Sequence, residues 1–101
     1  MITNKGGYIY IVSNKNRTTL YIGVTSDLSS RSWEHKNNQG SSFTKKYNCT
    51  DLIYYEIFES IETAIEREKT LKKWKRMWKE ELIKKLNPEM NDLFDEVREM
   101  L

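Results

Sequence analysis

Two short runs of β-branched and aromatic residues near the N-terminus constrain the fold of this chain most strongly. The first run is YIYIVS and the second is TTLYIGVT, and only the four residues NKNR separate them. Residues of these types favour strands and asparagine favours turns, so the pair predicts a β-hairpin. The chain has 101 residues, which is enough for one hydrophobic core but not for two. We therefore expect a single domain over residues 1–101.

Side chains alternate between the two faces of such a hairpin. One face is aliphatic and consists of Ile9, Ile11, Leu20, Ile22 and Val24. Tyr10, Tyr21 and Gly23 fall on the other face, which we expect to be accessible if the aliphatic face is core. Tyrosines in small sheets usually contribute packing, but a glycine inside a strand indicates that another group approaches closely, and a phosphate or a metal ion is one candidate.

The rest of the chain predicts one more strand and several helices. Residues 25–38 begin with possible capping residues and end in asparagines, which is typical of a helix. Residues 51–60 read as a third strand, either central or at an edge that is packed on both sides. Residues 61–86 form a long helical region after Ser60, either as one helix or as two helices that meet near Lys79. A closing helix follows within residues 88–101. The fold class is therefore α+β: a small three-stranded antiparallel sheet flanked by helices.

Composition limits the kinds of site that the chain can carry. With one cysteine and one histidine, it cannot form an internal disulfide or a thiolate or multi-histidine zinc site, so any metal must be held by oxygen ligands. No apolar run approaches the roughly 20 residues that span a bilayer, and the N-terminus lacks the pattern of a signal peptide. We expect a cytoplasmic protein without a membrane segment.

The net charge of +2 hides an uneven distribution. Residues 69–79 contain six basic residues and no acid, whereas residues 89–101 contain five acids and one arginine. A basic helix can contact phosphates, but it can equally be a solvated face paired with nearby glutamates. Charge alone leaves both interpretations open.

Helical spacing selects one carboxylate as unusual. Glu68 lies close to the centre of the stripe formed by Ile61, Ala64 and Ile65, whereas neighbouring glutamates do not. A carboxylate on a core-facing stripe must be neutral, paired or bound to a cation. The alternatives are that the stripe ends there and Glu68 reaches solvent, or that it pairs with Arg31.

In the first predicted helix, the same spacing places Arg31 and His35 one turn apart on the face that Leu28 marks as inward, while Trp33 points elsewhere. Arginine can hold a phosphate through two parallel hydrogen bonds, and histidine can exchange a proton near neutral pH. The pair suits phosphodiester chemistry, although such a pair is also common as an ordinary packing feature.

These motifs together resemble the GIY-YIG nuclease superfamily. The resemblance rests on YIYIV, then YIG with its tyrosine eleven residues after Tyr10, then DLSSRSWEHK and AIEREKTLKKWKR, and it covers nearly the whole chain. It is strongest to the small stand-alone bacterial domains, which are similar to the N-terminal nuclease domain of excinuclease C. Tyr8 stands where the name-giving glycine would be, and the role of Asn87 in NPEMNDL is left open.

The resemblance implies a role for each residue of the site. Tyr10 and Tyr21 would line it, and Arg31 would contact the scissile phosphate. Glu68 would be the sole protein ligand of one Mg²⁺ or Mn²⁺ ion. His35 would assist proton transfer near the tyrosines. The implied reaction is hydrolysis, in which water attacks phosphorus while the ion and Arg31 stabilise the charge on the leaving 3′ oxygen, with either Tyr10 or His35 as the proton acceptor.

The implied function is a DNA endonuclease, structure-selective or non-specific, in repair, recombination or DNA uptake, acting as a monomer or with a repair partner protein. The alternative is a DNA-binding or partner-dependent module that keeps the fold without cleaving. The residues expected to contact nucleic acid are Gly23, Trp33, Lys36, Lys45, Lys46, Lys72, Lys73 and Arg76. For Trp74 and Trp78 we expect core packing, and for Trp33 stacking and packing are equally favoured.

Overall fold

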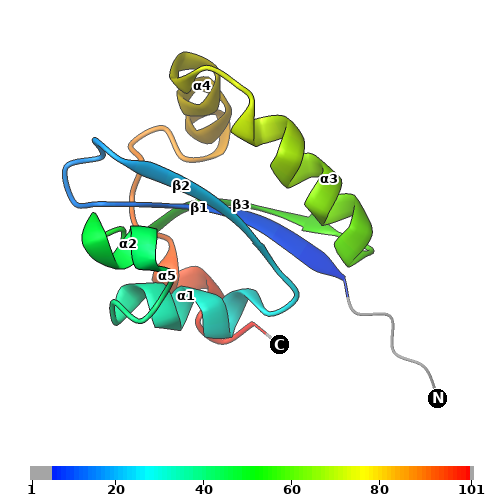
Figure 1. Ribbon diagram of the computed structural model, residues 1–101, viewed down its shortest axis with the longest axis horizontal. Coiled ribbons are helices and arrows are strands. Elements are labelled where there is room, and N and C mark those ends of the chain that lie inside the picture. The colour runs from blue at the N-terminus through cyan, green and yellow to red at the C-terminus, as the bar shows by residue number, and fades with distance from the viewer. Residues whose placement is uncertain (1–5, 101) are drawn as a thin grey trace.

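The computed structural model describes residues 6–100 and contains a sheet between two layers of helices (Figure 1). The strands are β1 (Gly7–Ser13), β2 (Leu20–Thr25) and β3 (Asp51–Phe58). The helices are α1 (Leu28–Lys36), α2 (Ser42–Lys46), α3 (Ile61–Lys72), α4 (Arg76–Leu86) and α5 (Phe94–Val97). Helices α3 and α4 lie on one side of the sheet, and α1, α2 and α5 lie on the other (Figure 1).

The three strands are antiparallel in the order β2-β1-β3, which confirms the predicted sheet. The hairpin strand β1 is central, and β3 is an edge strand whose first half is buried on both faces. The register between β1 and β3 shifts after Ile11, which pairs with Tyr54, while Val12 pairs with Leu52. Ile53 is therefore the extra residue of a bulge, which bends the strand locally.

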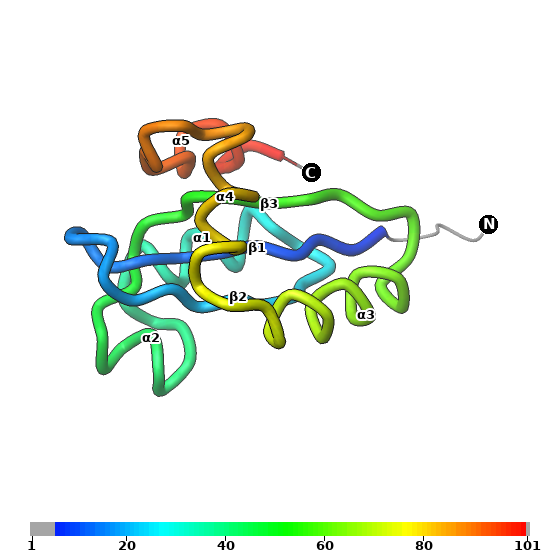
Figure 2. The backbone as a smooth tube through the Cα atoms, turned by 90° about the horizontal axis from the view of Figure 1, so that it is seen from above, coloured from blue at the N-terminus to red at the C-terminus, as the bar shows by residue number. Residues whose placement is uncertain are grey.

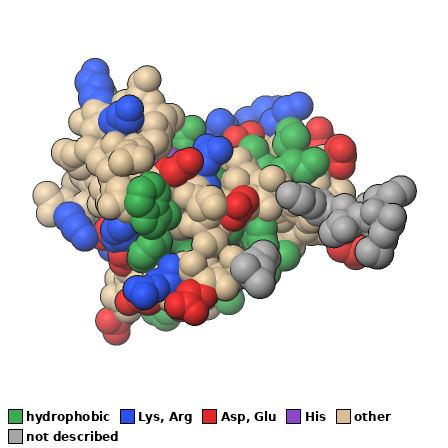
Figure 3. Space-filling view, turned by 90° about the horizontal axis from the view of Figure 1, so that it is seen from below, with side chains coloured by type: hydrophobic (Ala, Val, Ile, Leu, Met, Phe, Trp, Pro, Cys, Tyr) green, Lys and Arg blue, Asp and Glu red, His purple; other side chains and the backbone are tan. Residues whose placement is uncertain are grey.

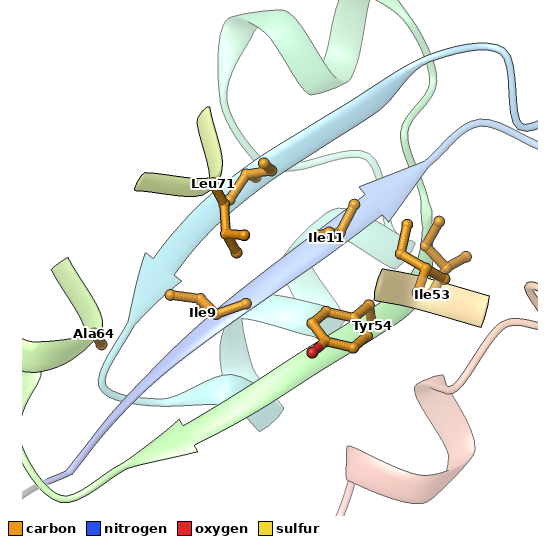
Figure 4. Packing of buried hydrophobic residues seen from close by; sticks show 8 residues of the cluster. Ile9, Ile11, Ile53, Tyr54, Ala64 and Leu71 are labelled. Atoms are coloured by element: carbon orange, nitrogen blue, oxygen red, sulfur yellow. The ribbon is translucent and has the colours of Figure 1, made fainter. Parts of the chain in front are cut away.

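The aliphatic face of the hairpin is core, as predicted. Ile9 and Ile11 are fully buried against Ala64 and Leu71 of α3 and against Ile53 (Figure 4). Burial of such side chains contributes about 1.5–3 kcal/mol each. This packing fixes α3 over β1 and β2.

The opposite face is a second core, so the expectation of an accessible face is wrong. Tyr10 and Val12 pack there with Leu28 of α1 and Val97 of α5, and Tyr10 is only 2% exposed. Alternation along the strands predicts which residues share a face, but it does not predict what covers that face. This face is covered by α1, which precedes β3 in the chain, and by α5, which follows it.

Local signals place most helix ends correctly. Ser60 caps α3 by accepting a hydrogen bond from the backbone N–H of Thr63 at 3.2 Å, and Asp27 caps α1 in the same way through Ser30 at 3.1 Å. The closing helix, α5, has only four residues and is shorter than predicted. Leu101, the last residue of the segment predicted to hold this helix, lies outside the described residues.

The break in the long helical region lies at residues 73–75, before the predicted position near Lys79. Lys75 is extended, with φ −66° and ψ 154°, so α4 begins at Arg76. The guanidinium of Arg76 then reaches the hairpin loop, where Nη1 donates to the Thr18 carbonyl at 2.8 Å. This tertiary contact favours the earlier break.

Asn87 has a structural role at the end of α4. Its side-chain amide donates to the carbonyls of Ile53 and Asn91, both at 2.9 Å, and its carbonyl oxygen accepts from the backbone N–H of Asn91 at 3.0 Å. It therefore ties β3 to the C-terminal segment, which Figure 2 shows crossing to the β3 side of the molecule, away from α3. None of the helices in residues 6–100 is long and apolar enough to cross a membrane.

Candidate functional site

A buried tyrosine and a buried histidine form the centre of the candidate site. Tyr10 of β1 and His35 of α1 are each 2% exposed. Tyr10 Oη and His35 Nε2 lie 3.0 Å apart and share a hydrogen bond whose donor depends on the histidine tautomer. Strand alternation turns Tyr10 toward α1, and His35 lies two turns after Leu28 on the inward side of that helix. Two of the predicted site residues are therefore in direct contact.

Two glycines make room for these rings. Gly23 is the register partner of Tyr10, and a Cβ atom there would lie 2.3 Å from Tyr10 Oη. A Cβ atom at Gly40 would lie 2.3 Å from His35 Nδ1. The close approach predicted at Gly23 is real, but Tyr10 occupies the space that the sequence argument assigned to a phosphate or metal. Gly23 is buried, so we withdraw it from the predicted nucleic-acid-binding residues.

Burial keeps both groups neutral. It raises the pKa of Tyr10 to about 12, although the charge of Arg31 acts in the opposite direction. Burial also lowers the pKa of His35 to about 4, and here the charge of Arg31 acts in the same direction. At neutral pH, His35 is therefore an uncharged hydrogen-bond partner of Tyr10, which revises the expectation that it exchanges protons there.

Arg31 and Tyr21 lie at the border of this buried pair. Arg31 lies one turn before His35 on α1, its side chain is 44% exposed, and Nε is 3.0 Å from Glu34 Oε1. Tyr21 of β2 is half-buried, and its ring centroid is 6.2 Å from that of His35. Four of the five predicted site residues thus gather on the α1 side of the sheet, with one partly exposed cation beside them.

Glu68 lies on α3, on the other side of the sheet (Figure 1). Of the predicted inward stripe, Ala64 is fully buried and Ile61 and Ile65 are half-buried, and the fully buried Leu71 continues the stripe beyond Glu68. The Glu68 side chain is 16% exposed, and Oε2 is 3.2 Å from Nζ of Lys72. Within residues 6–100, no hydrogen bond or ion pair joins it to Arg31, whose partner is Glu34. What the two sides share is β2, against which α3 packs and from which Tyr21 projects.

The three tryptophans have different environments. Trp74 packs against the aliphatic core, as expected, and meets Trp78 edge to face with ring centroids 6.1 Å apart. Trp78 is 48% exposed, so the expectation of core packing is wrong for it. Trp33 is 50% exposed beside a hollow that Phe94 and Arg98 also line.

Two of the predicted nucleic-acid contacts are engaged within the protein. Lys36 Nζ lies 3.0 Å from Asp51 Oδ1 and also pairs with Asp92. Arg76 pairs with Glu80 at 2.7 Å and holds the hairpin loop. Contacts of both residues with nucleic acid stay a prediction, because an ion pair within the protein does not test them. The remaining lysines of the predicted set are exposed: Lys45, Lys46, Lys72 and Lys73. Figure 3 shows basic and acidic side chains interspersed on the face that carries α1 and α5.

Sequence reasoning missed α2 and its two aromatic residues. Phe43 stacks on Tyr21 with ring centroids 5.6 Å apart, and Tyr47 lies 4.7 Å from Phe43. The available signal was Ser41 as a helix cap, followed by aromatics at positions i and i+4. A helix of five residues is too short for its periodicity to be recognised.

Comparisons with known proteins show the family to which this chain belongs. Residues 6–87 match the model of the GIY-YIG catalytic domain. A UPF0213 protein of Staphylococcus saprophyticus is 38% identical over 76 residues, covering 75% of this chain and 92% of that protein. A UPF0213 protein of Streptococcus pyogenes is 36% identical over 74 residues, covering 73% of this chain and 79% of that protein.

A solved structure has the same fold. The solution NMR structure of a UPF0213 protein from Bacillus halodurans matches with a TM-score of 0.54 and 27% identity. The match covers 83% of this chain and 88% of that one. The α+β sheet with its flanking helices is thus shared with a small protein of the same kind.

Proposed function

Because the chain belongs to the GIY-YIG family, we propose that it is a metal-dependent endonuclease that hydrolyses phosphodiester bonds in DNA. The observation that carries the proposal is the contact between Tyr10 and His35 beside the partly exposed Arg31. A buried neutral pair next to an accessible guanidinium is an arrangement that can bind a phosphate and orient it.

The outer edge of β2 is the place where this chemistry fits. β2 is an edge strand, so none of the other described strands covers its outer side. Tyr21 leaves β2 toward α1, while α3 with Glu68 packs on the other face of the same strand. A phosphodiester that straddles this edge would contact Arg31 from one side and the Glu68 region from the other.

The residues present fit one hard divalent cation. Residues 6–100 contain no cluster of three or more His, Cys, Asp or Glu residues, so a cage made wholly of protein ligands is absent there. Mg²⁺ retains most of its waters and needs only one or two carboxylates. Glu68 suits this need because it is partly exposed and its ion-pair partner, Lys72, is a half-exposed surface lysine. Mg²⁺ or Mn²⁺ there would supply positive charge that acidifies water and offsets charge on the phosphate.

The protein side chains then divide the remaining tasks. Arg31 binds the scissile phosphate through its guanidinium and stabilises the charge that develops on the phosphate oxygens. Tyr10, with a pKa of about 12, stays protonated and acts as a neutral hydrogen-bonding group. His35 positions Tyr10 through Nε2, and its pKa of about 4 makes it a weak base. Neither residue is therefore assigned as a strong general base.

Cleavage assays test this proposal. Purified protein is incubated with single-stranded, duplex and branched DNA in Mg²⁺, in Mn²⁺ and in chelator. We expect cleavage only with a divalent cation, and a loss of about 100-fold or more in rate for Glu68→Gln and for Arg31→Ala. Glu66→Gln, on the same helix but 78% exposed, is the matched control and should cut like the wild type.

Two results would overturn the proposal. One is the absence of cleavage of every substrate under all metal conditions, which, if binding persists, supports a non-cleaving DNA-binding module. The other is cleavage by Glu68→Gln and Arg31→Ala at the rate of Glu66→Gln. Thermal unfolding of each variant establishes that a loss of rate is not a loss of folding.

A further inference from the structure

An unbroken series of rings leads from the buried pair to the surface. Tyr10 and His35 have ring centroids 5.3 Å apart, and Tyr21 lies 6.2 Å from His35. Phe43 then stacks on Tyr21 at 5.6 Å with an interplanar angle of 28°, and Tyr47 follows at 4.7 Å. Each ring contacts the next, so α2 continues the candidate site outward.

Exposure rises along this series. Tyr10 is 2% exposed, whereas Phe43 is 42% and Tyr47 is 41% exposed. Burying such rings would stabilise a fold, whereas this segment presents them to solvent. The exposed rings are held in place, because Gly40 before α2 packs against His35 and Thr44 within α2 is buried.

The surroundings of these rings are basic. Residues 37–50 contain two lysines and no acid. Lys45 and Lys46 are exposed on α2, and Lys46 Nζ lies 5.3 Å from the centroid of the Tyr47 ring. Exposed aromatic side chains and neighbouring lysines are the two components that bind single-stranded nucleic acid, one for bases and one for phosphates.

We propose that Phe43 and Tyr47 form a stacking subsite for unpaired bases next to the scissile phosphate, and that they select single-stranded over duplex DNA. This extends the proposed function, because it places the subsite beside the same phosphate. In a duplex the base faces are already stacked on each other, so only an unpaired strand can present them to these rings.

Binding measured without turnover tests the subsite separately from cleavage. Fluorescence anisotropy is recorded in chelator with three probes: a single-stranded oligonucleotide, the same sequence as a duplex, and a strand of the same length with abasic sites. Phe43→Leu keeps an apolar side chain but removes the ring. Trp78→Leu removes an exposed ring on α4 and is the matched control.

We expect Phe43→Leu to weaken binding of the single strand about 10-fold and to leave the abasic strand and the duplex unchanged. Tyr47→Leu should act in the same direction, and it provides a second variant if Phe43→Leu fails to fold. Trp78→Leu should bind every probe like the wild type. Lys45→Ala, by contrast, should weaken binding of all three probes and reduce the salt dependence.

Several outcomes would overturn the subsite. One is that Phe43→Leu weakens binding of the normal and the abasic strand equally. Another is that neither Phe43→Leu nor Tyr47→Leu changes binding of the single strand. A third is that the wild type binds duplex more tightly than the single strand. Because chelator prevents cleavage, the two proposals fail separately. A protein that cuts DNA but is indifferent to Phe43→Leu refutes only the subsite, and one that shows the ring effect but never cuts refutes only the nuclease.

Discussion

His35 is enclosed by Tyr10 on one side and Gly40 on the other, and this enclosure decides how it responds to acid. Its Nε2 bonds to Tyr10, whereas Nδ1 has no hydrogen-bond partner within residues 6–100 and lies beside Gly40. A proton added to this ring would be buried at 2% exposure next to the positive Arg31. Folding therefore holds His35 in its neutral form.

We predict that the free energy of unfolding falls by about 2–3 kcal/mol through His35 between pH 7 and pH 4.5. The pKa is about 4 in the folded protein against an ordinary 6.5, so His35 gains its proton in the unfolded chain as pH falls through 6.5 but stays neutral in the folded protein until about pH 4. Stability is fully present above pH 6.5 and is lost as pH falls toward 4. Urea unfolding at both pH values, compared with His35→Gln, measures the effect.

The His35→Gln variant should lose most of this pH dependence, because it has no group that titrates there. An equal decline in wild type and variant would contradict the prediction. The same comparison separates positioning from packing at pH 7, where a lower rate of DNA cleavage at unchanged stability would indicate that His35 orients Tyr10.

Sequence reasoning grouped four site residues into two pairs, which only the family resemblance joined, and it misread what surrounds them. Alternation and helical spacing are local rules, so they correctly grouped Tyr10 with Tyr21 and Arg31 with His35. The burial of Tyr10 depends on α1 and α5, which flank the sheet from distant parts of the chain. Gly23 makes room for the Tyr10 ring, which belongs to the neighbouring strand β1. This contact depends on strand pairing, so local rules could not predict it.

At the scale of elements, capping residues predicted where the longer helices begin. Short helices, and helix ends that depend on tertiary contacts, could not be predicted from the sequence. Ser60 and Asp27 begin α3 and α1 as their residue types indicate. The break before Arg76 and the single turn of α5 are set by contacts with other segments, which no local rule contains. Asn87 is the clearest example of such a tertiary feature, because its hydrogen bonds join β3 to the C-terminal segment.

We predict that Asn87→Ala lowers the free energy of unfolding by about 2 kcal/mol. The substitution leaves the carbonyls of Ile53 and Asn91 without their donor and frees the backbone N–H of Asn91. The side chain of Asn87 is buried, so water cannot readily replace these bonds. Equilibrium denaturation measures the change. Asn91→Ala is the matched control at an exposed asparagine, and equal stability of the two variants would contradict the prediction.

At the scale of the whole molecule, Asp51 is the point where distant segments meet. Its buried carboxylate accepts hydrogen bonds from Lys15 and Arg17 of the hairpin loop, each at 2.9 Å, and from Lys36 at the end of α1 at 3.0 Å. Lys36 in turn pairs with Asp92 of the C-terminal segment. The two carboxylate partners of Lys36 are 15 and 56 residues away in sequence, so no local rule could have predicted these ion pairs.

Asp51→Asn should therefore destabilise the protein in a pH-dependent way. Burial alone would raise the pKa of Asp51, but the hydrogen bonds from Lys15, Lys36 and Arg17 outweigh it and hold the pKa at about 2, against an ordinary 3.8. The ionised form is thus favoured by folding, and its contribution of about 2 kcal/mol is present above pH 3.8 and lost as pH falls toward 2. Denaturation at pH 7 and pH 2.5 should show the variant less stable than the wild type at pH 7, with the difference reduced to about one third at pH 2.5. Asp95→Asn removes a carboxylate that is 89% exposed and should change stability little at either pH. A constant difference between Asp51→Asn and wild type at both pH values would mean that the carboxylate contributes through shape alone, with no contribution from charge.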